Sequence, residues 1–180
     1  PKSFDAHFYL GRVFYAVKEY AGAVKELRAA VDLNPRHAES RFFLGTALES
    51  VGDSPLAMVE YQELVKLEPD SAIGQLGLGA LLVKEGKADE AITALKRASV
   101  LDPKNFEAHR ALGLALNQRE RYAEAVEVLK TAIALAPYRA DAHYQLGLAL
   151  RRLGRNEEAA SEFKLVDKLN TEYRTGTSKQ

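Results

Sequence analysis

The sequence predicts an all-α solenoid built from five helical hairpins, because short marks recur along it with a period of 34 residues. A glycine preceded by leucine recurs at this period, at Gly11, Gly45, Gly79, Gly113 and Gly147. An alanine stands twelve residues after each glycine, at Ala23, Ala57, Ala91, Ala125 and Ala159. A proline follows after twelve more in four units, at Pro35, Pro69, Pro103 and Pro137, and Thr171 takes its place in the fifth. One hairpin cannot bury its own apolar face, so we expect the units to stack.

The first helix of each unit is expected to carry the glycine. Apolar residues four positions apart, such as Leu146 and Leu150, form one stripe of an amphipathic helix there. Glycine inside a helix costs about 1 kcal/mol relative to alanine. Its recurrence therefore indicates that a neighbouring helix approaches too closely for a Cβ atom, and we expect the repeated alanine on the other side of this contact.

The second helix of each unit is expected to carry the alanine and to end before the proline. A second apolar stripe begins at the alanine, as in Ala125, Val128, Leu129 and Ala132. Proline lacks an N–H group and disfavours helix in the residue before it. The five units span about residues 4–37, 38–71, 72–105, 106–139 and 140–171. We expect them to form one domain, 1–171, followed by a polar C-terminal tail, 172–180.

Turn residues between the helices fit this plan. Ser54 is expected to cap a second helix, with Pro55 in its first turn. Gly86 and Gly154 stand where a helix end needs a left-handed backbone conformation.

Glycine, alanine and proline at these offsets resemble the tetratricopeptide repeat, from Phe4 to about Thr171. The resemblance implies a right-handed superhelical solenoid of helix-turn-helix repeats that serves as a protein-interaction scaffold or adaptor. The early aromatic residue of the family is absent, and its positions hold His7, Arg41, Gln75, His109 and His143. We expect the histidines among these residues to pack between repeats.

The resemblance also implies a concave groove lined by the first helices. The implied positions follow a spacing of four and then three within a repeat, hence one helical face. The predicted groove residues are Phe8, Arg12, Tyr15, Phe42, Thr46, Leu76, Ala80, Arg110, Leu114, Tyr144, Leu148 and Arg151. Aromatic residues and arginine often dominate interface energies, so we expect the groove to bind a peptide or helix with some acidic character. Roughly a third to a half of these side chains are expected to pack against the adjoining repeat instead.

Apolar residues at the two ends of the array support a second hypothesis, self-assembly into head-to-tail oligomers or filaments. The residues expected at these ends are Phe4, Phe14, Leu165, Val166 and Leu169. An equally weighted alternative is that the chain is a segment of a longer array whose flanking repeats cover both faces. A third hypothesis is that the repeats are the recognition module of a larger enzyme or secretion assembly.

Composition argues against several other functions. Lys and Arg together number 25, as do Asp and Glu, so the chain has no net positive charge to attract nucleic acid. The longest apolar run, 76–83, is too short to span a membrane. Absence of cysteine is compatible with an oxidising or a reducing compartment, so no localisation is predicted.

Catalytic and metal sites are not expected. His7, His109 and His143 occupy the same place in their repeats, and successive repeats stand roughly 10 Å apart, too far to share one metal ion. No nucleophile, base and orienting group cluster in the sequence. We therefore expect no enzyme activity and no cofactor, with a protein or peptide as the partner.

Overall fold

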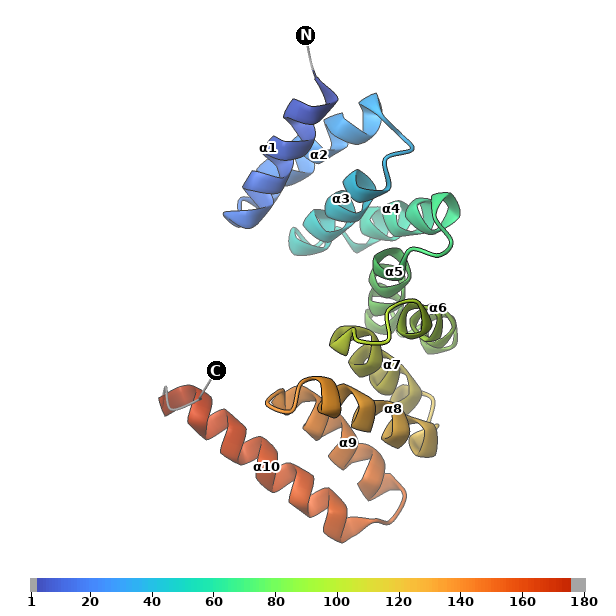
Figure 1. Ribbon diagram of the computed structural model, residues 1–180, viewed down its shortest axis with the longest axis vertical. Coiled ribbons are helices and arrows are strands. Elements are labelled where there is room, and N and C mark those ends of the chain that lie inside the picture. Colours follow the sequence, from blue (N-terminus) through green and yellow to red (C-terminus); the bar gives the residue numbers. More distant parts are fainter. Residues whose placement is uncertain (1–2, 176–180) are drawn as a thin grey trace. The chain divides into compact units, whose positions relative to one another are not determined.

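The computed structural model describes residues 3–175, which form ten α-helices and no strand (Figure 1). The first helices of the repeats are α1 (Phe4–Ala16), α3 (Ala38–Ser50), α5 (Ala72–Lys84), α7 (Phe106–Gln118) and α9 (Ala140–Arg152). The second helices are α2 (Tyr20–Leu33), α4 (Ser54–Leu67), α6 (Ala88–Leu101), α8 (Tyr122–Leu135) and α10 (Asn156–Thr175). The predicted all-α fold of five helical hairpins is confirmed.

The chain divides into two compact units, Pro1–Leu81 and Leu82–Gln180, which are described separately. In the first unit α1 packs against α2, α2 against α3, and α3 against α4, and the first helices α1 and α3 also contact each other. The second unit repeats this order from α6 to α10, with α7 in contact with α9. Each unit therefore has a surface formed by neighbouring first helices.

Four of the repeated glycines, Gly11, Gly45, Gly113 and Gly147, lie where a side chain of the second helix approaches closely. A Cβ atom on Gly11 would lie 2.6 Å from Leu27 Cγ, and one on Gly147 would lie 2.7 Å from Phe163 Cε1. This confirms the close approach predicted from the sequence. The nearest residue is not the repeated alanine, however, but the larger side chain four positions after it. The alanine, as at Ala159, is buried one helical turn away.

Filling one of these contacts should destabilise the second unit. In Gly147→Leu the new side chain would compete with Phe163 for the same space, and overpacking of this kind typically costs about 1–3 kcal/mol. Ala123→Leu, at an exposed position of α8, is the matched control and should stay within about 0.5 kcal/mol of the parent. Urea unfolding of both variants measures the difference. Equal stability of the two variants would contradict the close contact.

Every turn within a hairpin places one residue in the left-handed region. The five residues, again 34 apart, are Lys18, Gly52, Gly86, Glu120 and Gly154, with φ between 57° and 84°. The left-handed conformation predicted for Gly86 and Gly154 is confirmed. Lys18 and Glu120 show that the repeat imposes this conformation even where the residue is not glycine.

The cap of α4 is one residue earlier than predicted. Asp53, not Ser54, is the N-cap, and its Oδ1 accepts the Leu56 N–H at 3.2 Å. Ser54 is already the first helical residue, followed by Pro55 as expected. A carboxylate is also favoured over a hydroxyl by the positive end of the helix dipole.

The last helix is longer than the other nine described. It continues to Thr175, so residues 172–175, expected in a polar tail, are helical, and residues 176–180 lie outside the described part of the chain. Thr171 stands where four repeats have proline, and its Oγ1 donates to the Asp167 carbonyl at 2.8 Å. The helix continues because the residue that ends the other second helices is missing here.

Candidate peptide-binding surface

Polar side chains at the position of the missing aromatic join the two helices of a repeat. In the last repeat His143 is buried, and its Nδ1 lies 2.6 Å from Glu162 Oε2 on α10. Its Nε2 lies 3.0 Å from the carbonyl oxygen of Pro137, in the preceding turn. In the first repeat His7 Nδ1 lies 2.7 Å from Glu26 Oε2 on α2. Each of these two histidines therefore has a carboxylate partner on its own hairpin, and His143 also contacts the turn that follows the preceding repeat.

The second, third and fourth repeats use variants of the same contact. Arg41 Nη1 lies 2.6 Å from Glu60 Oε2, and Arg41 Nε donates to the Pro35 carbonyl at 2.9 Å. Gln75 and His109 each contact only the carbonyl of the proline six residues earlier, at 3.0 Å. Each of the five side chains thus joins the start of its first helix to the second helix of the repeat, to the preceding turn, or to both.

The first unit forms an aromatic surface on α1 and α3. Tyr15 and Phe42 are half-buried there. The predicted groove residue Phe8 is only 4% exposed and lies beneath this surface. Phe43, which was not predicted, is central, with its ring 6.2 Å from that of Tyr15. The Arg12 guanidinium stacks 5.0 Å above Phe43. In the sequence, the adjacent pair Phe42 and Phe43 is the feature that could have indicated a role for Phe43.

Three further predicted residues of the first unit are half-buried. These are Thr46 on α3 and Leu76 and Ala80 on α5. Thr46 Oγ1 donates to the Phe43 carbonyl at 2.9 Å within its own helix. Arg12 lies 3.5 Å from Glu39 in an exposed ion pair of the kind that contributes little stability.

The second unit forms a more accessible surface on α7, α9 and the start of α10. Leu114 and Leu148 are half-buried, and Tyr144 is 47% exposed. The Tyr144 ring lies 5.9 Å from that of Phe163, and the exposed Arg151 guanidinium stacks 5.5 Å from the same ring. The aromatic and cationic groups therefore form one continuous cluster.

Asn117 joins the two first helices beside this cluster. Its Nδ2 donates to the Gln145 carbonyl at 3.0 Å and to Gln145 Oε1 at 3.2 Å, which links α7 to α9. Its Oδ1 is buried without a hydrogen-bond partner in the described chain. A buried oxygen without a hydrogen-bond donor is uncommon. Here it belongs to the amide group whose nitrogen links α7 to α9.

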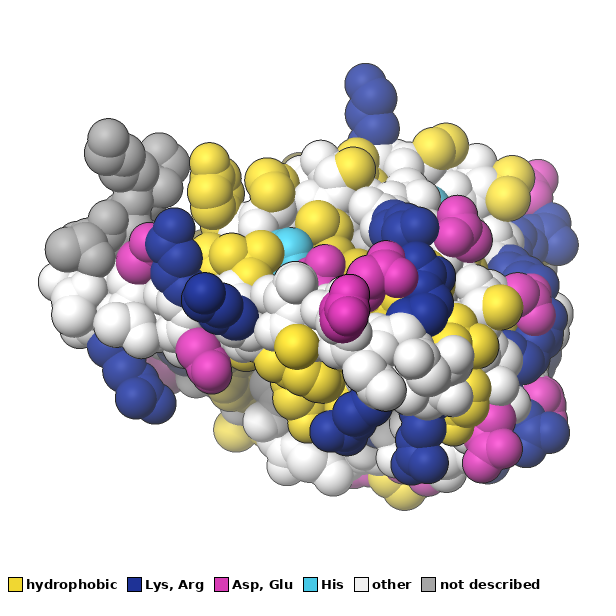
Figure 2. All heavy atoms as spheres, turned by 90° about the horizontal axis from the view of Figure 1, so that it is seen from below, with side chains coloured by type: hydrophobic (Ala, Val, Ile, Leu, Met, Phe, Trp, Pro, Cys, Tyr) yellow, Lys and Arg dark blue, Asp and Glu magenta, His cyan; other side chains and the backbone are white. Residues whose placement is uncertain are grey.

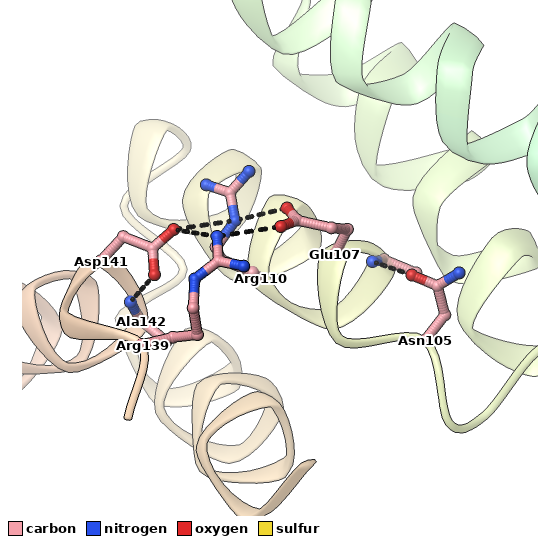
Figure 3. A network of polar contacts seen from close by, with 7 residues as sticks. Asn105, Glu107, Arg110, Arg139, Asp141 and Ala142 are labelled. Carbon is pink, nitrogen blue, oxygen red and sulfur yellow. Dashed lines mark hydrogen bonds and ion pairs between the residues drawn. The ribbon is translucent and has the colours of Figure 1, made fainter. Parts of the chain in front are cut away.

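A charge network at the start of α7 and α9 neutralises the second predicted arginine (Figure 3). Arg110 Nε lies 2.7 Å from Glu107 Oε2 and 3.4 Å from Asp141 Oδ2. Arg139 Nη2 lies 3.0 Å from each of the same two carboxylates, and its hydrogen bond to Asp141 raises the pKa of the arginine. Arg110 is thus already balanced by two carboxylates, so Arg151 is the better candidate to attract an acidic group.

The residues expected at the two self-association ends differ in their surroundings. Phe4 and Phe14 pack within the first repeat, since the Phe4 ring stacks 5.8 Å from Phe8 and Phe14 covers Gly22. Leu165, Val166 and Leu169 are half-buried on α10. Figure 2 shows the molecule from below, where hydrophobic side chains gather between charged ones.

Residues 3–175 contain no group of three or more side chains placed to bind a metal ion. A pocket of about 280 Å³ lies between α8, α9 and α10, over Leu146 and Leu150. Its carboxylates are already paired, Glu158 with Arg155 and Glu162 with His143. None of the described helices is both long and apolar enough to cross a membrane.

Stacked hairpins whose first helices form an open apolar surface define a repeat scaffold for protein interaction. The sequence model of the tetratricopeptide repeat matches residues 10–72, 51–105, 76–140 and 121–171. The chain therefore belongs to the tetratricopeptide repeat family. This repeat is typical of scaffolds without catalytic activity, whose partners are proteins.

Solved structures of MamA share the fold. The structure titled MamA 41-end from Desulfovibrio magneticus RS-1 has a TM-score of 0.84 at 23% identity, over 93% of this chain and 95% of that one. The structure titled Crystal structure of MamA protein has a TM-score of 0.82 at 22% identity, over 98% and 97%. A third, of MamA AMB-1, has a TM-score of 0.79 at 26% identity, over 91% and 96%. No curated protein matches the sequence. The likeness extends over nearly the whole chain and supports the superhelical solenoid fold.

Proposed function

We propose that this chain is an adaptor that binds an amphipathic or extended peptide on the inner faces of its first helices. The second unit supports this function most directly. Tyr144, Leu148 and Arg151 lie on one face of α9 and are accessible or half-buried. Aromatic and arginine side chains of this kind supply most of the binding energy in many interfaces.

The single observation that carries the proposal is the cluster of Tyr144, Phe163 and Arg151. Its two rings lie 5.9 Å apart, and the Arg151 guanidinium is 5.5 Å from the Phe163 ring. Arg151 has no carboxylate partner within ion-pair distance in the described chain, in contrast to Arg110. The preferred peptide therefore carries apolar or aromatic residues with an acidic residue beside them.

The experiment is selection of peptides from a random library, followed by affinity measurement on purified variants. Tyr144→Ala should weaken selected peptides about tenfold or more, since an interface aromatic typically contributes 1.4 kcal/mol or more. Tyr138→Ala is the matched control, because Tyr138 is 75% exposed in the turn before α9 and outside the surface.

Arg151→Ala tests the expected acidic character of the peptide. It should weaken peptides that contain an acidic residue and leave their neutral analogues unchanged. If Tyr144→Ala and Tyr138→Ala bound every selected peptide equally, the surface on α9 would not be the binding site.

A further inference from the structure

Helix α1 has apolar side chains on its outer side as well as on its core side. Phe8 on the core side is buried, while Tyr9, Leu10 and Val13 on the opposite side are exposed. A helix that is apolar all round is normally covered on both sides. This outer face of α1, defined by Ala6, Tyr9, Leu10 and Val13, has no cover in the described chain.

The other repeats show what normally covers this face. Val13 is 56% exposed, whereas the residues at its position in the next four repeats are 0% exposed: Ala47, Leu81, Ala115 and Ala149. The position of Ala6 is likewise buried in α3, α5, α7 and α9. In α3, α7 and α9 the second helix of the preceding repeat packs against the first helix. The outer face of α1 is therefore one half of a repeat joint.

Helix α10 carries the other half of such a joint. Ala160 is exposed, and Phe163 and Val166 are half-buried. Their counterparts in α8, where α9 covers the surface, are all buried: Val126, Leu129 and Ala132. We call Ala160, Phe163 and Val166 the outer face of α10.

Two contacts within the first unit define the register of a joint. A Cβ atom on Gly74 would lie 3.0 Å from Leu64 Cγ, and one on Gly77 would lie 2.7 Å from Tyr61 Cε1. Three residues forward on the first helix thus correspond to three residues back on the second, as in an antiparallel pair. Transferred by the 34-residue period, this register places Ala6 against Val166 and Tyr9 against Phe163.

About one further turn along both helices, Val13 lies near the level of Ala160, and these two side chains compensate in size. Three of the four corresponding internal pairs place the larger residue on the second helix: Val24 with Ala47, Ile92 with Ala115 and Val126 with Ala149. The fourth, Met58 with Leu81, has a large residue on both helices. At the chain ends the order is reversed, with the small residue on α10 and the large one on α1. Combined side-chain volume equals that of the two internal pairs made of valine and alanine, and volume-conserving exchanges of this kind are tolerated in packed cores.

We propose that the outer face of α1 packs on the outer face of α10 of a second copy, in the register of the internal joints. Each copy has one face of each kind, so the contact is heterologous and continues as a filament or closes as a ring. This assembly goes beyond peptide binding and shares Phe163 with the proposed peptide-binding cluster. Val13 and Ala160 lie outside that cluster, so variants at these two positions test assembly without changing Tyr144, Phe163 or Arg151.

The test is sedimentation velocity of the full chain over a wide concentration range. The parent chain should form species larger than a dimer as concentration rises. Val13→Glu and Ala160→Glu should each be monomeric at all concentrations, since a charge in a packed joint is strongly unfavourable. Both positions are exposed in the single chain, so both variants should keep the parent circular dichroism and, at concentrations low enough for the parent to be monomeric, its unfolding midpoint. Val100→Glu, at a residue 76% exposed on α6, is the control and should assemble like the parent.

Mixing the two variants distinguishes the proposed contact from other arrangements. Val13→Glu retains the α10 face and Ala160→Glu retains the α1 face, so an equimolar mixture should form dimers and nothing larger. Assembly of Ala160→Glu alone would indicate a symmetric contact between two α1 helices and overturn the proposal. A parent chain that stays monomeric throughout would also overturn it, as expected if a flanking repeat of a longer polypeptide covers α1.

Discussion

Replacing Tyr61 by alanine should destabilise the first unit by about 3–5 kcal/mol, the usual cost of removing a large aromatic side chain from a core. Tyr61 is 1% exposed, and its ring lies between two glycines. A Cβ atom on Gly45 or on Gly77 would come within 2.7 Å of Tyr61 Cε1. The cavity left by the ring could be closed only if α3 or α5 moved as a whole, because Gly45 and Gly77 have no side chain that could turn to fill it.

Two further variants separate the ring from its hydroxyl group. The Tyr61 hydroxyl donates to Glu49 Oε2 at 2.7 Å, and burial, followed by the Glu49 charge, raises the pKa of Tyr61. Tyr61→Phe keeps the ring and should cost about 1 kcal/mol. Tyr61→Leu introduces the residue found at this position in repeats one, three and four, and should fall between the other two variants because Gly77 leaves extra space.

Urea unfolding followed by circular dichroism measures the free energy of unfolding of all three variants. The expected order of loss is Tyr61→Ala, then Tyr61→Leu, then Tyr61→Phe. If Tyr61→Ala lost no more than Tyr61→Phe, the ring would not be filling the space between the two glycines.

The fold was predictable because its marks are local. Each repeated residue marks one local feature: glycine a close contact between helices, alanine a buried position, and proline the end of a helix. Five copies of this pattern therefore predict ten helices. Departures from the pattern were harder to interpret. The sequence shows Thr171 in place of the proline that ends the other second helices. It does not show how far α10 continues beyond this residue, and the helix ends at Thr175.

The candidate surface was only partly predictable, because its properties depend on partners distant in sequence. The position of Arg110 on a first helix followed from the repeat, but its neutralisation by Asp141 required the geometry of two adjacent repeats. Exposure of Leu10 and Val13 was missed for a similar reason. In other repeats these positions are buried or half-buried under the second helix of the preceding repeat, and none of the described helices takes that place over α1.

Removing the positive charge from Arg41 should destabilise the first unit by about 3–5 kcal/mol, the cost of breaking a buried ion pair. The side chains of Arg41 and Glu60 are 13% and 10% exposed, and Nη1 lies 2.6 Å from Oε2. In Arg41→Gln the Glu60 carboxylate would remain buried without its cation. Thermal and urea unfolding of this variant measure the loss.

The chain itself supplies the compensating variant. The third repeat has Gln75 and Ala94 at the two positions occupied by Arg41 and Glu60, and it is folded without the ion pair. Arg41→Gln combined with Glu60→Ala should therefore recover most of the stability lost in the single variant, because no uncompensated charge remains. If the double variant were as unstable as Arg41→Gln alone, loss of packing by the arginine side chain, rather than the unpaired Glu60 carboxylate, would be the cause of the destabilisation.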